Sequence, residues 1–266
     1  MALRRLDAEL TRRGLARSRE HARDLIASGA VVVRGTVAAK PATQVNDFDS
    51  IVVQADEVGH GYVSRGAVKL AGALDHFTEI TVADRLCLDA GASTGGFTEV
   101  LLRRNAASVL AVDVGYGQLA WSLRTDDRVH VYERMNVRSM TADDFPFRPS
   151  LVVADLSFIS LEVVLPAMRA TSSPEAEYLL MVKPQFEVGR ESVGDGVIRD
   201  PGLRAGAVEK VATCAAGLGL STQGVVASPL PGPSGNVEFF LWLSAGEPVA
   251  DTLKSMIDRA IEEGPQ

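Results

Sequence analysis

The segment Asp89–Phe97, with the sequence DAGASTGGF, has residue types that could carry chemistry. It contains G-x-S-x-G, the turn that presents a nucleophilic serine in hydrolases, and it is rich enough in glycine for a phosphate-binding loop. A hydrolase of this kind needs an acid and then a histidine further along the chain, yet only His130 of the four histidines follows Ser93. A phosphate loop needs a following Gly-Lys-Ser/Thr, which is absent. Both interpretations are therefore poorly supported.

A third interpretation is a loop that holds S-adenosylmethionine. Asp89 places an acid at the mouth of the loop and the spacing G-x-G-x-x-G is absent, which disfavours a dinucleotide pyrophosphate. Asp113 follows Gly91 by 22 residues and ends the next apolar run, where an acid can accept hydrogen bonds from both ribose hydroxyls. Anionic surroundings suit a ligand with a sulfonium and an ammonium group. We therefore predict S-adenosylmethionine as the cofactor.

The elements that must position this loop follow from the apolar pattern after residue 84. Short apolar runs predict strands at 85–91, 108–114, 129–133, 151–157, 177–183, 222–227 and 236–244. Helical spacing predicts helices at 97–104, 117–124, 161–169 and 203–218. Strands that alternate with helices and are almost continuously apolar indicate an α/β fold, a mostly parallel sheet covered on both faces.

Ligands of such sheets bind beyond the carboxyl ends of the strands, so the polar residues that close strands are candidates for the site. These are Asp89, Asp113, Asn136, Asp155 and Lys183. Glu238 begins the last predicted strand and reaches the same edge if that strand is antiparallel. Lys69 lies on the helical stretch 66–77, before the first strand of this sheet.

Two lysines and two carboxylates at one edge suit methyl transfer to a weakly acidic hydroxyl. Lys183 is predicted to accept or steer the proton of a ribose 2′-hydroxyl while the acids hold the lysines in position. Each residue alone is more often a surface charge or a structural salt bridge, and that alternative stays open. No Cys/His cluster has ligand spacing, so no metal is expected.

The N-terminal segment differs from the rest of the chain in charge. Residues 1–34 carry eight arginines against four acids, a net charge of +4, whereas the whole chain carries −7 and the remainder therefore −11. Apolar spacing predicts a helix that ends near Gly14, a second helix over 19–28, a hairpin about Arg34-Gly35 and a further strand before residue 54. A basic segment attached to an acidic body indicates contact with a polyanion.

The pattern RLD…L…GLARSR…A…LI..G.V.V.G…..KP…V…D.I.V, over residues 5–53, resembles the RNA-binding module named after ribosomal small-subunit protein four. The resemblance implies RNA binding through an arginine face, with phosphate contacts from Arg5, Arg17, Arg19 and Lys40. Arg34 departs from the pattern, which usually has Asn before the hairpin glycine.

The pattern K…DAGASTGGF…D…DLSF…VKPQFE…GN.E resembles FtsJ-like ribose 2′-O-methyltransferases. Together with the N-terminal module, YVSRGAVKL and SPLPGPSGNVEFFLWL, it is similar to the TlyA/haemolysin A family over residues 4–243. The resemblance implies a Rossmann-like, S-adenosylmethionine-dependent methyltransferase of seven strands that methylates the cytidine 2′-hydroxyl in ribosomal RNA.

The family motifs assign roles to individual positions of this chain. The catalytic Lys-Asp-Lys-Glu tetrad corresponds to Lys69, Asp155, Lys183 and Glu238. The cofactor-binding residues correspond to Gly91, Ser93, Gly95, Asp113, Asn136 and Asp155. The joint departs from the aromatic-rich form frequent in the family, having HGYV before Ser64-Arg65.

Further RNA contacts are predicted near the site. Phe158 either stacks on a base rotated out of its helix or belongs to the core. Arg134 and Arg138 either hold phosphates or are solvated surface arginines, and Arg65 is also predicted to contact the RNA. The polar, Gly-rich segment 187–200 is either a lid over the substrate or simply a loop.

Three parts are expected: a small α+β RNA-binding domain (1–58), a linker (59–66) and the FtsJ-like domain (67–266). The start of the chain lacks the apolar core of a signal peptide, and no apolar run approaches the ~18 residues of a membrane span. Two cysteines fit a reducing compartment, so we expect a cytoplasmic protein. The resemblance implies ribosomal RNA or ribosomal subunits as partners, and a large folded RNA substrate favours a monomer. We expect no membrane and no obligate protein partner. The alternatives are a non-catalytic RNA-binding assembly factor and a membrane-damaging haemolysin.

Overall fold

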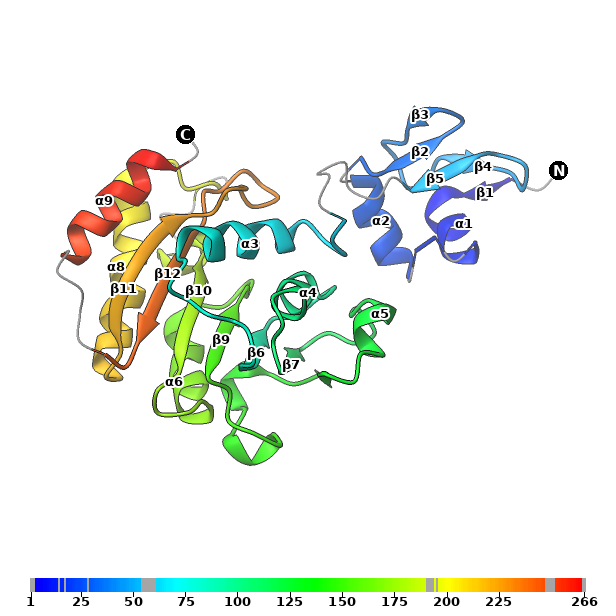
Figure 1. The fold of residues 1–266 in the computed structure, drawn as a ribbon. Coiled ribbons are helices and arrows are strands. Elements are labelled where there is room, and N and C mark those ends of the chain that lie inside the picture. The colour runs from blue at the N-terminus through cyan, green and yellow to red at the C-terminus, as the bar shows by residue number, and fades with distance from the viewer. Residues whose placement is uncertain are drawn as a thin grey trace. The chain divides into compact units, whose positions relative to one another are not determined.

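The structure, a computed structural model, describes residues 3–13, 15–16, 18–27, 29–53, 61–189, 194, 196–246 and 252–264 (Figure 1). It consists of two compact units, Met1–Gly61 and Tyr62–Gln266. The predicted linker 59–66 begins outside the described residues, and from Tyr62 onward its residues belong to the second unit. There the backbone N–H of Val63 donates to Glu99 Oε2 (2.6 Å).

The first unit contains two helices, α1 (Leu6–Arg12) and α2 (Arg19–Ala27), and two small antiparallel sheets. One sheet pairs β1 (Arg4–Arg5) with β4 (Gln44–Val45). The other has the order β3 (Thr36–Val37), β2 (Val31–Val33) and β5 (Ile51–Val53). Apolar side chains of both helices and of the strands form one buried core. The predicted small α+β module is confirmed. The pattern predicted one strand over 40–53, where the structure has β4 and β5, and it did not predict β1.

The β2–β3 hairpin turns at Arg34 (φ 52°) and Gly35 (φ 80°). Positive φ at both central residues is the geometry that matches the twist of a two-residue hairpin, and it disfavours a side chain such as arginine. Arg34 is held there by Asp49, through Nε to Oδ1 (2.8 Å) and Nη2 to Oδ2 (2.5 Å). This ion pair also holds the pKa of Asp49 at about 2.

The second unit is built on a seven-stranded sheet with the order β11-β12-β10-β9-β6-β7-β8. Its strands are β6 (Leu86–Ala90), β7 (Ser108–Asp113), β8 (Val129–Glu133), β9 (Leu151–Ala154), β10 (Glu177–Val182), β11 (Ser221–Ala227) and β12 (Phe239–Ser244). β12 is antiparallel to both of its neighbours, and the other pairings are parallel. The predicted strands and the mostly parallel sheet are confirmed.

Helices cover both faces of this sheet because alternate strand residues are buried on opposite sides. One core cluster joins the sheet to α6 (Leu161–Thr171), α8 (Pro201–Gly217) and α9 (Leu253–Glu263). The other joins it to α3 (Gly66–His76) and α4 (Gly96–Arg103) (Figure 1). The carboxyl ends of the central strands are thereby presented from a rigid frame.

Three helices differ from the prediction, and one of them is α7 (Pro184–Glu187), a single turn after β10 that was not predicted. The helix expected over 117–124 is only α5 (Trp121–Arg124), because Gly117 adopts φ 70° and its N–H donates to Glu133 Oε1 (2.7 Å) instead of joining a helix. α9 was not predicted; it buries Met256, Ile257 and Ala260 on one face.

Candidate active site

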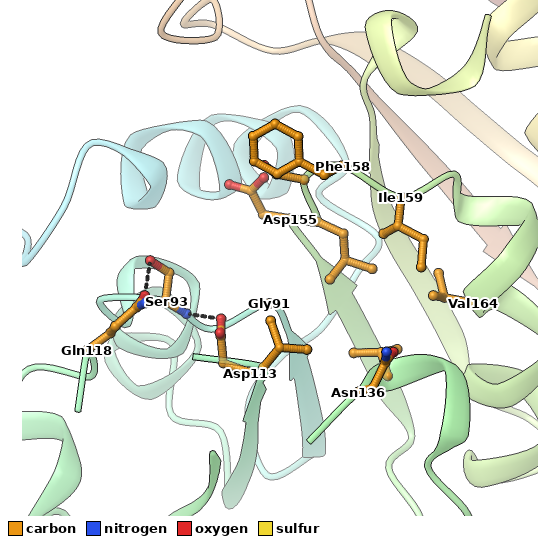
Figure 2. A pocket seen from close by; sticks show the side chains of 13 residues that line it. Gly91, Ser93, Asp113, Gln118, Asn136, Asp155, Phe158, Ile159 and Val164 are labelled. Atoms are coloured by element: carbon orange, nitrogen blue, oxygen red, sulfur yellow. Dashed lines mark hydrogen bonds between the residues drawn. The ribbon is translucent and has the colours of Figure 1, made fainter. Parts of the chain in front are cut away.

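A cavity of about 450 Å³ opens at the carboxyl ends of β6, β7 and β9 (Figure 2). Five of the six residues predicted to bind the cofactor line it: Gly91, Ser93, Asp113, Asn136 and Asp155. The apolar part of the wall comes from Val114, Val137, Leu156, Phe158, Ile159 and Val164. Gln118, which the sequence gave no reason to select, also lines it and accepts from Ser93 Oγ (3.3 Å).

Gly91 and Gly95, both predicted to bind the cofactor, have different structural roles. Gly91 adopts φ 88°, and a Cβ there would lie 2.5 Å from the carbonyl oxygen of Asp155, so only glycine lets the ends of β6 and β9 approach. Gly95, the sixth predicted residue, does not line the cavity. It adopts φ 98° before α4, where a Cβ would meet Leu119 at 2.8 Å. Gly95 therefore shapes the turn into the helix.

Asp113 organises the loop from the end of β7. Its Oδ2 accepts from the backbone N–H of Ser93 (2.8 Å; Figure 2). Its Oδ1 accepts from the backbone N–H of Gly115 (2.6 Å). Each carboxylate oxygen keeps a further lone pair for a ligand hydroxyl. On the opposite wall, exposed Asn136 begins a short 3₁₀ turn and accepts from the N–H of Arg138 (3.0 Å).

Asp89, the strand-closing acid expected at the mouth of the loop, is fully buried. Its Oδ2 accepts from Thr98 Oγ1 (2.6 Å), while Oδ1 has no hydrogen-bond partner among the described residues. Burial raises the pKa of Asp89 to about 7; hydrogen bonds with Thr98 oppose this shift, and the charges of Asp155 and Asp113 add to it. A cationic ligand fits this acidic edge, because it would offset the mutual repulsion of the three carboxylates.

The four predicted tetrad residues form two lysine–carboxylate pairs. Lys69 Nζ donates to Glu238 Oε2 (2.5 Å), and both side chains are buried. Lys183 Nζ lies 2.6 Å from Asp155 Oδ1 and donates to Ser157 Oγ (3.0 Å). Ser157 was not predicted, since nothing in its spacing distinguishes it from any polar loop residue.

The strand register brings these pairs to one edge. In the antiparallel pairing of β10 with β12, Val182 lies opposite Phe239, so Lys183 and Glu238 occupy adjacent strand ends. β12 is thus antiparallel, as the predicted position of Glu238 required. On the other side of β10, β9 ends beside it and is followed by Asp155. Helix α3, which carries Lys69, begins beside Asp155: a Cβ on Gly66, its first residue, would lie 3.9 Å from Asp155 Oδ2.

The predicted RNA contacts of the first unit are exposed where the structure describes them. Arg5 pairs with Asp7 through Nε (3.0 Å), and Arg19 reaches the same carboxylate through Nη2 (3.2 Å). Lys40 is exposed, and Arg17 lies outside the described residues.

The predicted RNA contacts of the second unit are also at the surface. Arg65, Arg134 and Arg138 are exposed, and the guanidinium of Arg134 lies 4.3 Å from the ring centroid of Tyr116. Phe158 is 91% exposed, so the alternative of a core phenylalanine is wrong. Its ring lies 5.3 Å from that of Phe186.

The segment 187–200 is described only in part, since residues 190–193 and 195 lie outside the described residues. Its far end is anchored by Asn236, whose Oδ1 accepts from the N–H of Ile198 (2.8 Å) and whose Nδ2 donates to the carbonyl of Gly196 (2.8 Å). Asn236 is two residues before Glu238, so the anchor lies beside the tetrad.

Comparison with known proteins identifies both units. An FtsJ-like methyltransferase model matches residues 62–245, and an S4 domain model matches residues 4–51. A Mycobacterium tuberculosis protein, the 16S/23S rRNA (cytidine-2′-O)-methyltransferase TlyA, is 58% identical and 98% of each chain is covered. This chain belongs to the TlyA family of FtsJ-like methyltransferases.

Some other similar proteins are named hemolysins. Hemolysin A of Brachyspira hyodysenteriae is 38% identical, covering 88% of this chain and 97% of that protein. The solved structure of a hemolysin candidate from Streptococcus thermophilus is 37% identical, covers 99% of this chain and 97% of its own, and superposes with a TM-score of 0.75. The Rossmann-like methyltransferase fold and the RNA-binding module expected from the sequence are confirmed.

Across the described ranges, no group of three or more His, Cys, Asp and Glu side chains is placed to hold a metal ion. No helix within the same ranges is both long enough and apolar enough to cross a membrane.

Proposed function

We propose that this protein transfers the methyl group of S-adenosylmethionine to the 2′-oxygen of cytidine in ribosomal RNA. The observation that carries the proposal is the pair of lysine–carboxylate contacts beside an acidic cavity, at one edge of the sheet. The Mycobacterium tuberculosis relative bears this activity in its name, and its similarity extends over 98% of this chain.

The residues of the cavity fit the cofactor. Asp113 would hold the ribose hydroxyls, Gly91 and Ser93 would face the methionine part, and Asn136 would border the adenine. The three carboxylates Asp89, Asp113 and Asp155 favour a positively charged ligand over an anionic one. When bound, S-adenosylmethionine supplies an electrophilic methyl group.

The tetrad then acts on the acceptor hydroxyl. Lys183 orients the 2′-hydroxyl by a hydrogen bond, and the oxygen attacks the methyl carbon as the bond from that carbon to sulfur breaks. The uncharged amine form of Lys183 is the one that accepts the released proton. Asp155 and Ser157 fix Lys183 Nζ in place through contacts of 2.6 and 3.0 Å. The buried Lys69, oriented by Glu238, stabilises the negative charge that develops on the oxygen. Much of the acceleration comes from fixing the line of approach.

RNA is bound by both units in this proposal. Arg5, Arg17, Arg19 and Lys40 of the module 1–58 contact phosphates, which gives affinity without selecting a nucleotide. Beyond the linker 59–66, in the domain 67–266, Arg134 and Arg138 hold phosphates near the cavity, as does Arg65 in the linker. Phe158 stacks on the base rotated out of the helix. A cytoplasmic monomer that meets ribosomal subunits is the state in which we expect this chemistry.

The test is transfer of a labelled methyl group to purified ribosomal subunits, followed by digestion of the RNA to nucleosides. The expected product is 2′-O-methylcytidine, mapped to a defined position in the small subunit, the large subunit or both. Label in a base, in protein or in another nucleoside would contradict the proposal. A purely structural assembly factor would bind subunits and leave their ribose unmodified.

The hemolysin name of some relatives offers a second candidate function. Lysis of red cells by the purified protein, free of other cell components, is its test. Among the residues that the structure describes, no observation favours it, whereas the two lysine–carboxylate pairs have an evident use in methyl transfer.

A further inference from the structure

Two short segments beside the cavity contact each other through several side chains. The first is the loop 155–161, which connects β9 to α6; the second begins at Lys183 and continues through α7 (Pro184–Glu187). Lys183 contacts Asp155 and Ser157, and the ring of Phe186 packs against that of Phe158 at 5.3 Å. Glu187 makes the last contact, at the start of α6.

Glu187 holds the loop by its far end. Its Oε2 accepts from Ser160 Oγ (2.5 Å), and its Oε1 accepts from the backbone N–H of Leu161 (2.8 Å). Ser160 is the N-cap of α6 and itself accepts from the N–H of Glu162 (3.2 Å). The Glu187 side chain is buried, and burial raises its pKa while these two hydrogen bonds oppose the shift. A buried carboxylate thus fixes the point where the loop becomes helix.

Phe158 needs such support. Its φ of 65° is a conformation that bulky side chains rarely adopt, and it persists only where the surroundings impose it. The ring is 91% exposed, so packing against the core does not impose it. The contacts on either side do: Ser157 is held by Lys183, and Ser160 and Leu161 are held by Glu187.

We propose that Glu187 is a positioning residue that keeps the loop 155–161 in the strained conformation presenting Phe158 to the RNA base. It does not touch the substrate; it acts through Phe158. This inference rests on the proposed function, because the base that Phe158 meets is the methylated cytidine or its neighbour.

Three variants separate this role from general stability. Glu187→Met removes both acceptors at nearly constant size. Glu187→Gln keeps a carbonyl oxygen for the N–H of Leu161 and a polar group for Ser160, so it should restore function. Glu162→Gln is the matched control, since the Glu162 carboxylate pairs with Lys210 (2.6 Å) in the first turn of α6.

The kinetic test is a double-mutant cycle with Phe158→Leu. Glu187→Met and Phe158→Leu should each lower kcat/KM for the RNA by ~tenfold, about the contribution of one stacked base. If Glu187 acts through Phe158, the double variant loses no more than either single variant. Losses that multiply to ~hundredfold, or wild-type turnover by Glu187→Met, would overturn the inference.

Hydrogen exchange of the full chain provides a test that needs no methyl transfer. Glu187→Met should speed exchange in the peptide 156–162, because Leu161 loses its acceptor, and Glu187→Gln and Glu162→Gln should not. Unchanged exchange in that peptide would refute the clamp. Wild-type protein that exchanges as expected but methylates no RNA would refute only the proposed function.

Discussion

Carboxylates meet cations in both units of the molecule, and the two arrangements differ. In the first unit, Asp7 lies within 3.5 Å of side-chain nitrogens of Arg5, Arg19 and Arg23, and Glu9 pairs with Arg12 and Arg13. In the second unit each tetrad carboxylate serves one lysine: Glu238 serves Lys69, and Asp155 serves Lys183. We call Asp7 and Glu9 hubs, because each pairs with more than one arginine. Each tetrad carboxylate pairs with a single lysine.

The difference separates a binding surface from a reaction site. Arginine presents a rigid fork that grips both oxygens of a carboxylate, as Arg5 does with Asp7. Hydrogen bonds from these arginines hold the pKa of Asp7 and of Glu9 at about 2, so the hubs stay charged at any physiological pH. Lysine is a compact charge on a flexible stem that can move a proton. Nearby Asp89, with its pKa of about 7, is the carboxylate poised to titrate.

Breaking the buried pair of the second unit should have the largest effect. Lys69→Met leaves the Glu238 carboxylate buried without its partner and should lower the free energy of unfolding by about 3–5 kcal/mol. The double variant Lys69→Met/Glu238→Gln should recover most of that stability. The rate of methyl transfer should stay at least ~10²-fold below that of the wild type in the single and in the double variant. A neutral pair is enough for folding, whereas the reaction needs the charged pair.

Urea unfolding and single-turnover methylation measure the two quantities. Lys254→Met, which breaks the exposed pair with Asp258, is the control and should change neither. Recovery of turnover together with stability in the double variant would show that the Lys69–Glu238 pair is merely structural.

Removing the Asp7 carboxylate from the first unit should have a smaller effect, on the affinity for RNA, and opposite in sign to what net charge predicts. Asp7→Asn makes the module more basic, so net charge alone predicts tighter binding of RNA. Loss of the hub frees Arg5, Arg19 and Arg23, and ordering them on the RNA should instead weaken binding by ~tenfold.

Titration of labelled ribosomal RNA at several salt concentrations decides between the two signs. Glu20→Gln, on the exposed side of α2, adds the same charge without touching a hub and should leave binding equal or tighter. Tighter binding by both variants would mean that charge, not preorganisation, governs the module.

The pH dependence of cofactor binding should give the smallest effect. Below its pKa of about 7 Asp89 is neutral, and a cationic ligand favours its ionised form. The dissociation constant of S-adenosylmethionine should therefore fall, by roughly threefold, as pH rises from 6 to 8 and then level off. Calorimetry of Asp89→Asn should show a flat profile, and a wild-type profile in this variant would assign the titration to another group.

Much of the second unit follows from its sequence because the signals are local. Apolar runs of strand length and helical spacing depend on neighbouring residues alone, and they located every strand of the sheet. The position of Glu238 needed only one further fact, the direction of β12. Gly117 shows where local patterns fail. Its N–H donates to Glu133, sixteen residues later in the chain, and this distant contact keeps 117–120 out of the helix that their spacing predicts.

Burial of charge was not predictable in the same way. Asp7 and Glu9 entered the net charge of the first segment as ordinary acids, yet both are fully buried hubs. Their partners include Arg19, which is twelve residues from Asp7, so the pairing exists only after α1 and α2 have packed. Phe158 was equally open between core and surface, because its exposure depends on a backbone conformation that contacts from Lys183 and Glu187 support.

The most direct test of the central claim is the Lys183→Ala variant, assayed for methyl transfer to ribosomal subunits and for binding of cofactor and RNA. Since Lys183 is assigned to the reacting hydroxyl, the account predicts loss of transfer by ~10³-fold while both dissociation constants stay within about twofold of wild type. Transfer at a rate within about tenfold of wild type, with 2′-O-methylcytidine still the product, would contradict it.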